Sequence, residues 1–278
     1  MIHLFLAIIS SVLVSVLMRL STDRVKQNVG MLVMNYLMCT LLAAAYTGFG
    51  TPASAPSALV PTVGMGILHG ALYLVSFVLF QMNVRKNGVV LSATFMKLGL
   101  LVPIAVSILA FGEQPQLLQV FGFALAVAAI LLINGKSEGG AVRSLGGLIL
   151  LLLCGGCADM MAKVFEELGE KTLEQQFLLY TFIAALVLCV ILMLLKKQRP
   201  GGAEVLFGAL IGIPNFFSAK FLLRALESVD AVIAYPTYSV ATLLIITLTG
   251  VLLFREKLGK RQWIALGIIL LALALLNL

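Results

Sequence analysis

The chain has 278 residues, of which 61% are hydrophobic and 11% charged, and its mean hydropathy is +1.10. A soluble domain carries roughly 25% charged residues, so this composition excludes a water-soluble globular protein. In a soluble protein the net charge of +7 would suggest nucleic acid, but no segment here combines dense basic residues with aromatic ones. No nucleic-acid partner is therefore expected.

Ten apolar segments follow one another along the chain, separated by short polar joints. A membrane-spanning helix needs about 20 mainly apolar residues, whereas barrel strands are shorter and alternate in polarity. The sequence therefore predicts an all-α integral membrane protein with ten transmembrane helices. The first segment lacks the basic start and cleavage site of a signal peptide and is expected to be retained. The predicted spans are residues 2–20, 29–48, 62–83, 89–111, 117–134, 144–165, 175–195, 205–226, 231–254 and 261–278.

An internal repeat appears when the chain is shifted by 143 residues, the separation of Glu113 from Glu256. Residues 1–135 and 136–278 are accordingly predicted to be two five-helix repeats. Because five is an odd number, the second repeat must be inverted in the membrane relative to the first. The matched polar pairs are Thr94 with Thr237, Glu113 with Glu256, Gln119 with Gln262, and Asn134 with Asn277.

Lys and Arg are distributed unevenly between the joints, and their distribution predicts the orientation of the chain. The even-numbered joints hold only Lys171 and Arg224, each near acidic residues. Positive joints lie in the cytoplasm, so both termini are predicted to be extracytoplasmic in the cell (inner) membrane. The basic residues of the odd-numbered joints are Arg19, Arg24, Lys26, Arg85, Lys86, Lys136, Arg143, Lys196, Lys197, Arg199, Arg255, Lys257, Lys260 and Arg261.

The repeat and its joints resemble the EamA-type transporters of the drug/metabolite transporter (DMT) superfamily. The first copy of the family pattern consists of Phe111, Gly112, Glu113, Gln119 and Gly122. The second copy consists of Phe254, Arg255, Glu256, Gln262 and Ala265, with Arg and Ala where the family usually has Gly.

The resemblance implies transport by alternating access around a cavity between the two halves. Family members move amino acids, nucleotide sugars, drugs and other metabolites, often outward. Two roles stay open for Glu113 and Glu256. They contact a substrate, or they organise their joints through backbone N–H groups at the start of the next helix.

Four ionisable residues within the predicted spans are functional candidates: His69, Lys97, Asp159 and Lys220. Such a side chain costs roughly 2.5–3.5 kcal/mol at a helix centre on insertion scales, so each is a functional candidate by default. Lys97 is far from both ends of the fourth span. It is predicted to bind an anionic group or carry a coupling proton, the alternative being a structural contact with a carbonyl or hydroxyl group.

Asp159 and Lys220 are predicted to lie at similar depth in the outer half of the membrane. They are expected to pair across two helices, either as an outer gate or proton switch or as a fixed ion pair. Lys163 and Arg224, each one turn further out, are expected to extend to the membrane surface.

His69 and three further polar residues, Asn215, Tyr235 and Tyr238, are candidates for substrate contact. His69 is either a titrating group or a hydrogen-bonded packing residue. Asn215 follows Pro214, and a proline in mid-helix allows an interruption of the kind that marks binding sites in repeat transporters. Tyr235 and Tyr238 flank another proline and either stack on a substrate or belong to the interfacial aromatic belt.

No cofactor or metal is expected. Redox or zinc chemistry would need a surrounding fold or further ligands that the sequence lacks, so the cysteines are expected to pack helix against helix. They are Cys39, Cys154, Cys157 and Cys189.

The residues and the resemblance together favour a secondary transporter for a small amino acid-like, anionic or zwitterionic solute or a drug. The resemblance implies outward transport. No Walker motif is present, so ATP-driven transport is not expected without a partner. A flippase of the same fold for lipid-linked substrates stays open as an alternative. An integral membrane enzyme is less well supported, because no clustered catalytic constellation is apparent. Substrate identity, a coupling proton, contacts with membrane lipid and a homodimer also stay open.

Overall fold

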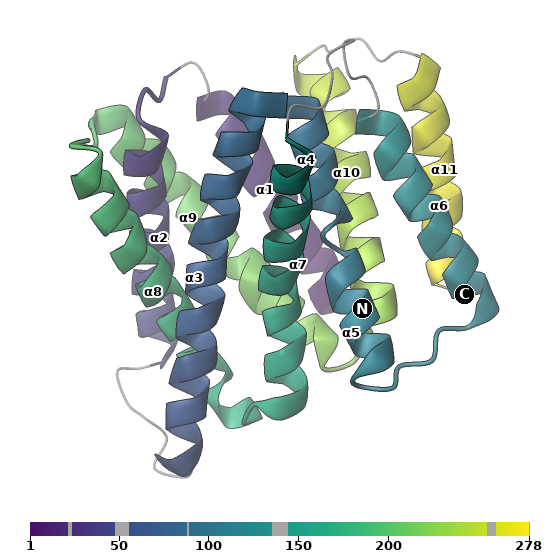
Figure 1. Cartoon of the computed structure of the whole chain (residues 1–278), viewed down its shortest axis with the longest axis horizontal. Coiled ribbons are helices and arrows are strands. Elements are labelled where there is room, and N and C mark those ends of the chain that lie inside the picture. Colours follow the sequence, from purple (N-terminus) through teal and green to yellow (C-terminus); the bar gives the residue numbers. More distant parts are fainter. Residues whose placement is uncertain (22–23, 48–55, 88, 135–143, 255–259, 278) are drawn as a thin grey trace. The chain divides into compact units, whose positions relative to one another are not determined.

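The computed structural model describes residues 1–21, 24–47, 56–87, 89–134, 144–254 and 260–277, and all regular elements in these ranges are helices (Figure 1). The helices are α1 (Ile2–Ser21), α2 (Asn28–Thr47), α3 (Pro56–Asn87), α4 (Val89–Leu98), α5 (Leu101–Leu109), α6 (Leu117–Asn134), α7 (Leu145–Leu168), the short η1 (Lys171–Leu173), α8 (Glu174–Leu195), α9 (Gly202–Leu226), α10 (Ala231–Phe254) and α11 (Lys260–Leu276).

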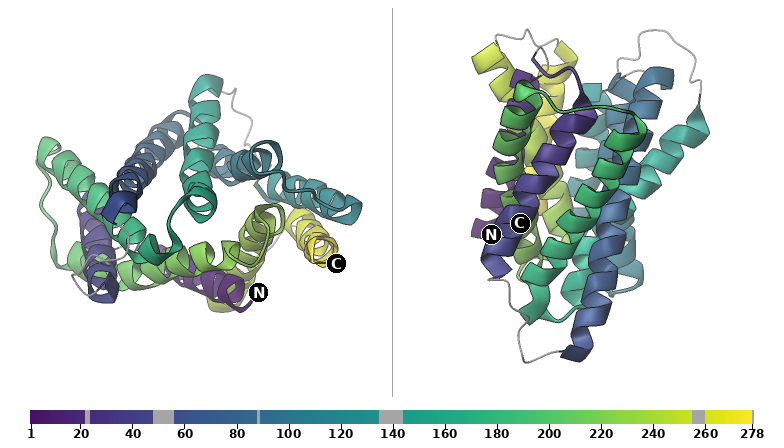
Figure 2. Two further views of the ribbon diagram at one scale, coloured as in Figure 1. Left: turned by 90° about the horizontal axis from the view of Figure 1, so that it is seen from below. Right: turned by 90° about the vertical axis from the view of Figure 1, so that its left-hand side faces the viewer.

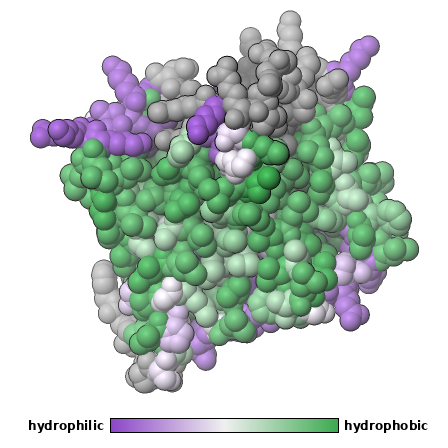
Figure 3. All heavy atoms as spheres, in the orientation of Figure 1, coloured by the Kyte–Doolittle hydropathy of each residue, from purple (hydrophilic) through white to green (hydrophobic). Residues whose placement is uncertain are grey.

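Seven helices of the described ranges are long and apolar enough to cross a membrane: α1, α2, α3, α7, α8, α9 and α10. Shorter apolar segments fall in the fourth, fifth and tenth predicted spans, at Phe95–Leu109, Leu117–Leu132 and Trp263–Leu276. The number of ten crossings therefore stays a prediction. Large hydrophobic side chains are widely exposed, and they dominate the face seen in Figure 3, as contact with lipid requires.

The fourth predicted span, residues 89–111, is two helices rather than one, because α4 ends at Leu98 and α5 begins at Leu101. Pro103 has no N–H to donate to the carbonyl of Gly99, which accepts instead from Val102 at 2.9 Å. This tighter turn interrupts the regular α-helical pattern. The break leaves Lys97 in the last turn of α4.

Two compact units divide the chain, and each takes helices from both predicted repeats. Unit 1 consists of Met1–Leu74 and Val164–Ala225, and unit 2 of Val75–Lys163 and Leu226–Leu278. The predicted boundary between repeats, at residues 135 and 136, lies outside the described residues. The division into two repeats at that point therefore stays a prediction.

Close helix packing in unit 1 depends on pairs of glycines four residues apart. A Cβ atom on Gly66 of α3 would lie 2.9 Å from the Phe177 carbonyl oxygen of α8, and one on Gly212 of α9 would lie 2.6 Å from the Asn35 oxygen of α2. In the predicted repeat, α3 would be equivalent to α9 and α2 to α8. Both glycine contacts let two helices approach closely, as small residues commonly do between membrane helices.

In unit 2, α6 packs along α11 (Figure 2), and α10 contacts α5, α6 and α11. The buried core between these helices is entirely aliphatic and includes Ile104, Ile130, Val240 and Ile269. The break between α4 and α5 lies against α7, where a Cβ atom on Gly99 would come within 3.0 Å of the Gly156 nitrogen. This contact fixes Lys97 near the middle of α7.

Candidate functional site

Lys97 of α4 and Asp159 of α7 carry opposite charges inside unit 2. The glycine contact between the α4–α5 break and α7 lies two residues after Lys97 and three before Asp159, which explains why these positions come together. Their opposite charges attract each other, yet the two described side chains make no direct ion pair with each other. Lys97 is half-buried and Asp159 is exposed. Together they are termed the central charge pair.

The break between α4 and α5 places Lys97 beside polar backbone groups. The apolar sequence around Lys97 does not indicate this polar environment. At the end of α4 the carbonyl groups of Met96 and Lys97 accept from the N–H groups of Gly99 and Leu100, at 3.2 and 3.4 Å. The partial negative charge of a helix C-terminus favours a cation there. Discontinuous helices of this kind form substrate and ion sites in repeat transporters. Sequence reasoning missed this break, although Gly99 followed four residues later by Pro103 was a signal for it.

Tyr235 of α10 positions α7 beside the central charge pair. Its hydroxyl donates to the backbone carbonyl of Asp159 at 2.6 Å, and the residue is 2% exposed. The tyrosine therefore joins two helices in this structure. Tyr238, on the same helix, is half-buried, and its predicted contact with a substrate stays a prediction. The helix α10 continues through the proline between them.

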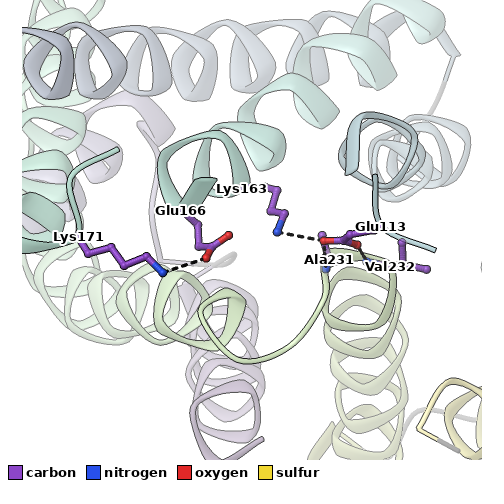
Figure 4. Close-up of polar contacts among 6 residues, drawn as sticks. All are labelled: Glu113, Lys163, Glu166, Lys171, Ala231 and Val232. Carbon is purple, nitrogen blue, oxygen red and sulfur yellow. Dashed lines mark hydrogen bonds and ion pairs between the residues drawn. The ribbon is translucent and has the colours of Figure 1, made fainter. Parts of the chain in front are cut away.

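Glu113 holds together three parts of unit 2 (Figure 4). Its two carboxylate oxygens accept from the N–H groups of Ala231 and Val232, each at 3.0 Å, and so cap the start of α10. The Lys163 ammonium of α7 donates to the same carboxylate at 3.0 Å, with side chains 5% and 9% exposed. Gly112, with φ of 71°, provides the turn before Glu113 that a side chain would disfavour. Glu113, Lys163 and the first two N–H groups of α10 are termed the α10 latch.

The α10 latch corrects two expectations. Lys163 does not extend to the membrane surface, because a buried carboxylate holds it inside unit 2. Glu113 does organise a helix start, but that of α10 rather than the next helix, α6. The start of α6 is capped by Gln119, whose side-chain oxygen accepts from the N–H of Gln116 at 3.0 Å. The repeat equivalent, Glu256, lies outside the described residues.

Lys220 of α9 lies in unit 1, where an aromatic ring faces its charge. Its ammonium is 3.3 Å from the ring centroid of Tyr46, a cation–π contact. Arg224 forms an ion pair with the buried Glu174. Its extension to the membrane surface stays a prediction. Asp159 and Lys220 belong to different units, so their pairing stays a prediction.

His69 of α3 is buried in a stack of rings in unit 1 and is 3% exposed. Its ring centroid is 4.6 Å from that of Tyr73 and 5.4 Å from that of Phe177. Its Nδ1 lies 3.4 Å from the Thr181 hydroxyl oxygen. The Thr181 hydroxyl donates to the Phe177 carbonyl at 2.8 Å, which leaves its oxygen free to accept from Nδ1–H. This arrangement suits a neutral packing histidine.

Asn215 ties α9 to α2 within unit 1. Its amide donates to the Asn35 side-chain oxygen at 3.2 Å, and the Cys39 thiol donates to the Gly212 carbonyl at 3.2 Å. These contacts hold the chain on both sides of Pro214, and α9 is one continuous helix. The kink that a proline in mid-helix allows at Pro214 stays a prediction.

Comparison with known proteins agrees with this geometry. The model of the EamA-like transporter family matches residues 142–278. A Haemophilus influenzae protein described as uncharacterized is 27% identical over 199 residues, which are 69% of this chain and 67% of that protein. A solved crystal structure with 16% identity covers 99% of this chain, and 94% of that chain is covered, with a TM-score of 0.74. At this identity the likeness shows the fold alone.

The fold and the apolar helices define an all-α, multi-pass integral membrane protein. Residues 142–278 match the EamA-like transporter family, the family that the joints predicted. This match suggests a membrane transporter of the DMT type.

Proposed function

We infer that this protein is a secondary transporter that moves a small anionic or zwitterionic solute across the cytoplasmic membrane by alternating access, in the outward direction. The observation that carries the proposal is the central charge pair. Lys97 and Asp159 lie within predicted membrane spans, are brought together by the contact of Gly99 with Gly156, and make no direct ion pair with each other. A pair with only a structural role would gain most from direct contact, because each charge costs roughly 2.5–3.5 kcal/mol inside the membrane.

The chemistry of the central charge pair favours a ligand with an anionic group. Lys97, at the α4–α5 break, offers an ammonium for a carboxylate or phosphate, and the exposed Asp159 offers a partner for a cationic group. A zwitterion would engage both residues, whereas a plain anion would engage Lys97 alone. Asp159 is also the group at which a coupling proton would act.

The first test removes the charge of Lys97 while keeping most of its length. A thermal-shift screen of metabolites identifies a ligand, because a bound ligand stabilises the folded state by mass action. The Lys97→Met protein in proteoliposomes is expected to stay monodisperse but to lose ligand-induced stabilisation. It should also lose at least about 90% of transport, because the loss of one charged contact changes an equilibrium about tenfold. Lys171→Met is the matched control, since this lysine side chain is 61% exposed. Normal transport by the Lys97→Met protein would show that the proposed ligand site at Lys97 is wrong.

A double variant separates ligand binding from structural pairing. If Lys97 and Asp159 only neutralise each other, removing both charges restores what either single change loses, because the cost of a lone buried charge disappears. If both bind the solute, Asp159→Asn with Lys97→Met transports no better than the single variants. In the same vesicles, translocation of a fluorescent lipid with no solute transport would favour the flippase alternative.

A further inference from the structure

Lys163 connects the central charge pair with the α10 latch along one face of α7. It follows Asp159 by four residues, a spacing that places two Cβ atoms about 5–6 Å apart on a helix. Its ammonium donates to Glu113 at 3.0 Å, whereas the charge acting on Asp159 is that of Lys97. Positive and negative side chains therefore alternate in the order Lys97, Asp159, Lys163, Glu113.

We propose that Lys163 switches between two carboxylates, Glu113 and Asp159, and that an anion bound at Lys97 drives the switch and so opens the α10 latch. This regulation rests on the proposed function, because it requires a ligand at the central charge pair. The proposed switch adds Lys163, a residue that touches no ligand. It relates ligand binding at the central charge pair to the contact between α7 and the start of α10.

The physical reason is that a buried cation moves only from one anion to another. Breaking a buried pair and leaving one charge alone costs about 3–5 kcal/mol. Asp159, one turn away on the same helix, offers Lys163 a second anion. While Lys97 acts on Asp159, that carboxylate is partly neutralised. An anionic ligand takes over the charge of Lys97, and Asp159 then attracts Lys163 more strongly. A ligand can bias two paired states of similar free energy in this way.

The geometry of the α10 latch allows Lys163 to leave without uncapping α10. Glu113 keeps its two bonds to the N–H groups of Ala231 and Val232 whether Lys163 is present or absent. What is lost is the link from α7 to the turn that carries Glu113. The end of α7 near Lys163 then separates from this turn, while Tyr235 still holds α7 to α10 at Asp159.

The test measures access to a thiol placed beside the central charge pair. Gly155 lies one turn from Asp159 on α7, and a Cβ atom there would meet no other atom within 4 Å, so Gly155→Cys is a tolerated reporter. The four native cysteines are replaced by Ala. A membrane-impermeant thiol reagent is applied to each side of vesicles in turn. No ligand is required, because Lys97→Met removes the cation from Asp159 as an anionic ligand would.

The switch predicts opposite effects of two changes. Lys97→Met is expected to raise the labelling rate about tenfold from the side on which Glu113 lies, a shift of about 1.4 kcal/mol toward the open latch. Adding Asp159→Asn removes the second carboxylate and should return the rate to its starting value. An unchanged rate in Lys97→Met, or an increase that persists with Asp159→Asn, would overturn the proposal.

Changes at Lys163 test the same step from the other end. Lys163→Met should raise the labelling rate whichever residue stands at position 159, and Lys163→Arg should keep it low because its charge still reaches Glu113. Lys171→Met controls for the loss of any lysine. If Lys163→Met does not fold, the variants of Lys97 and Asp159 decide by themselves. If Lys97→Met abolishes transport but leaves the labelling rate unchanged, the switch is wrong and the proposed function stands. If Lys97→Met raises the labelling rate while transport stays normal, the proposed function is wrong.

Discussion

Lys97 and Lys163, both in unit 2, have different partners for their charges. Lys163 has a carboxylate at 3.0 Å and an aromatic ring, that of Phe111, with its centroid at 5.9 Å. Lys97 has a helix end and a carboxylate that is not in direct contact. A charge with a full set of partners inside the protein stabilises the structure, whereas a charge with an incomplete set can bind a ligand. This difference supports the proposals of a ligand at Lys97 and of a positioning role for Lys163.

His69 illustrates how packing decides the role of a single titratable residue. It lies between two rings and beside a hydroxyl, so we expect packing to matter more than its charge. His69→Phe keeps the stack and loses one hydrogen bond, and should cost about 1 kcal/mol while transport is retained. His69→Ala opens a cavity and should cost about 3 kcal/mol, as for other buried aromatic residues.

Thermal unfolding in detergent and transport in proteoliposomes check this prediction for both variants of His69. A His69→Phe protein as stable as expected but without transport would show that the imidazole takes part in coupling or binding.

At the scale of helices, close packing of α3 on α8 depends on glycine. A Cβ atom on Gly70 would collide with the carbonyl oxygen of Thr181, which is backbone and cannot rotate away. Gly70→Ala should therefore push the two helices apart and lower the free energy of unfolding by about 1–3 kcal/mol. Gly64→Ala, on the same helix, meets no atom within 4 Å and should be neutral or slightly stabilising.

Thermal unfolding of the two glycine variants in one detergent gives a direct comparison. Equal stability of both would mean that α3 and α8 approach each other less closely than this structure has them.

At the scale of the whole molecule, the uneven distribution of Lys and Arg predicts that both termini lie outside the cytoplasm. A cysteine appended after residue 278, in a chain whose native cysteines are replaced by Ala, should react with an impermeant thiol reagent in intact cells. The same reagent should not reach a cysteine in the joint around Lys197 until the cells are lysed. The opposite pattern would reverse the topology and place the α10 latch on the cytoplasmic side.

How much of the site could be predicted differs from residue to residue. Lys97 and Asp159 were recognisable because a charge within an apolar segment is rare and expensive. That they approach each other was not recognisable, since it depends on Gly99 and Gly156, whose contact joins segments about 57 positions apart in sequence. Lys163 was expected at the surface, because no local pattern indicates that Glu113 lies opposite it.

The sequence by itself determined the membrane class, the positions of the helices and the family pattern. These depend on composition, on local apolar length and on short motifs, all of which are properties of neighbouring residues. Only the tertiary structure decided that α10 is capped by Glu113, that Pro214 and Pro236 leave their helices continuous, and that Pro103 accompanies a break. Those outcomes depend on which distant polar groups reach the freed backbone groups, and a linear pattern carries no information about such partners.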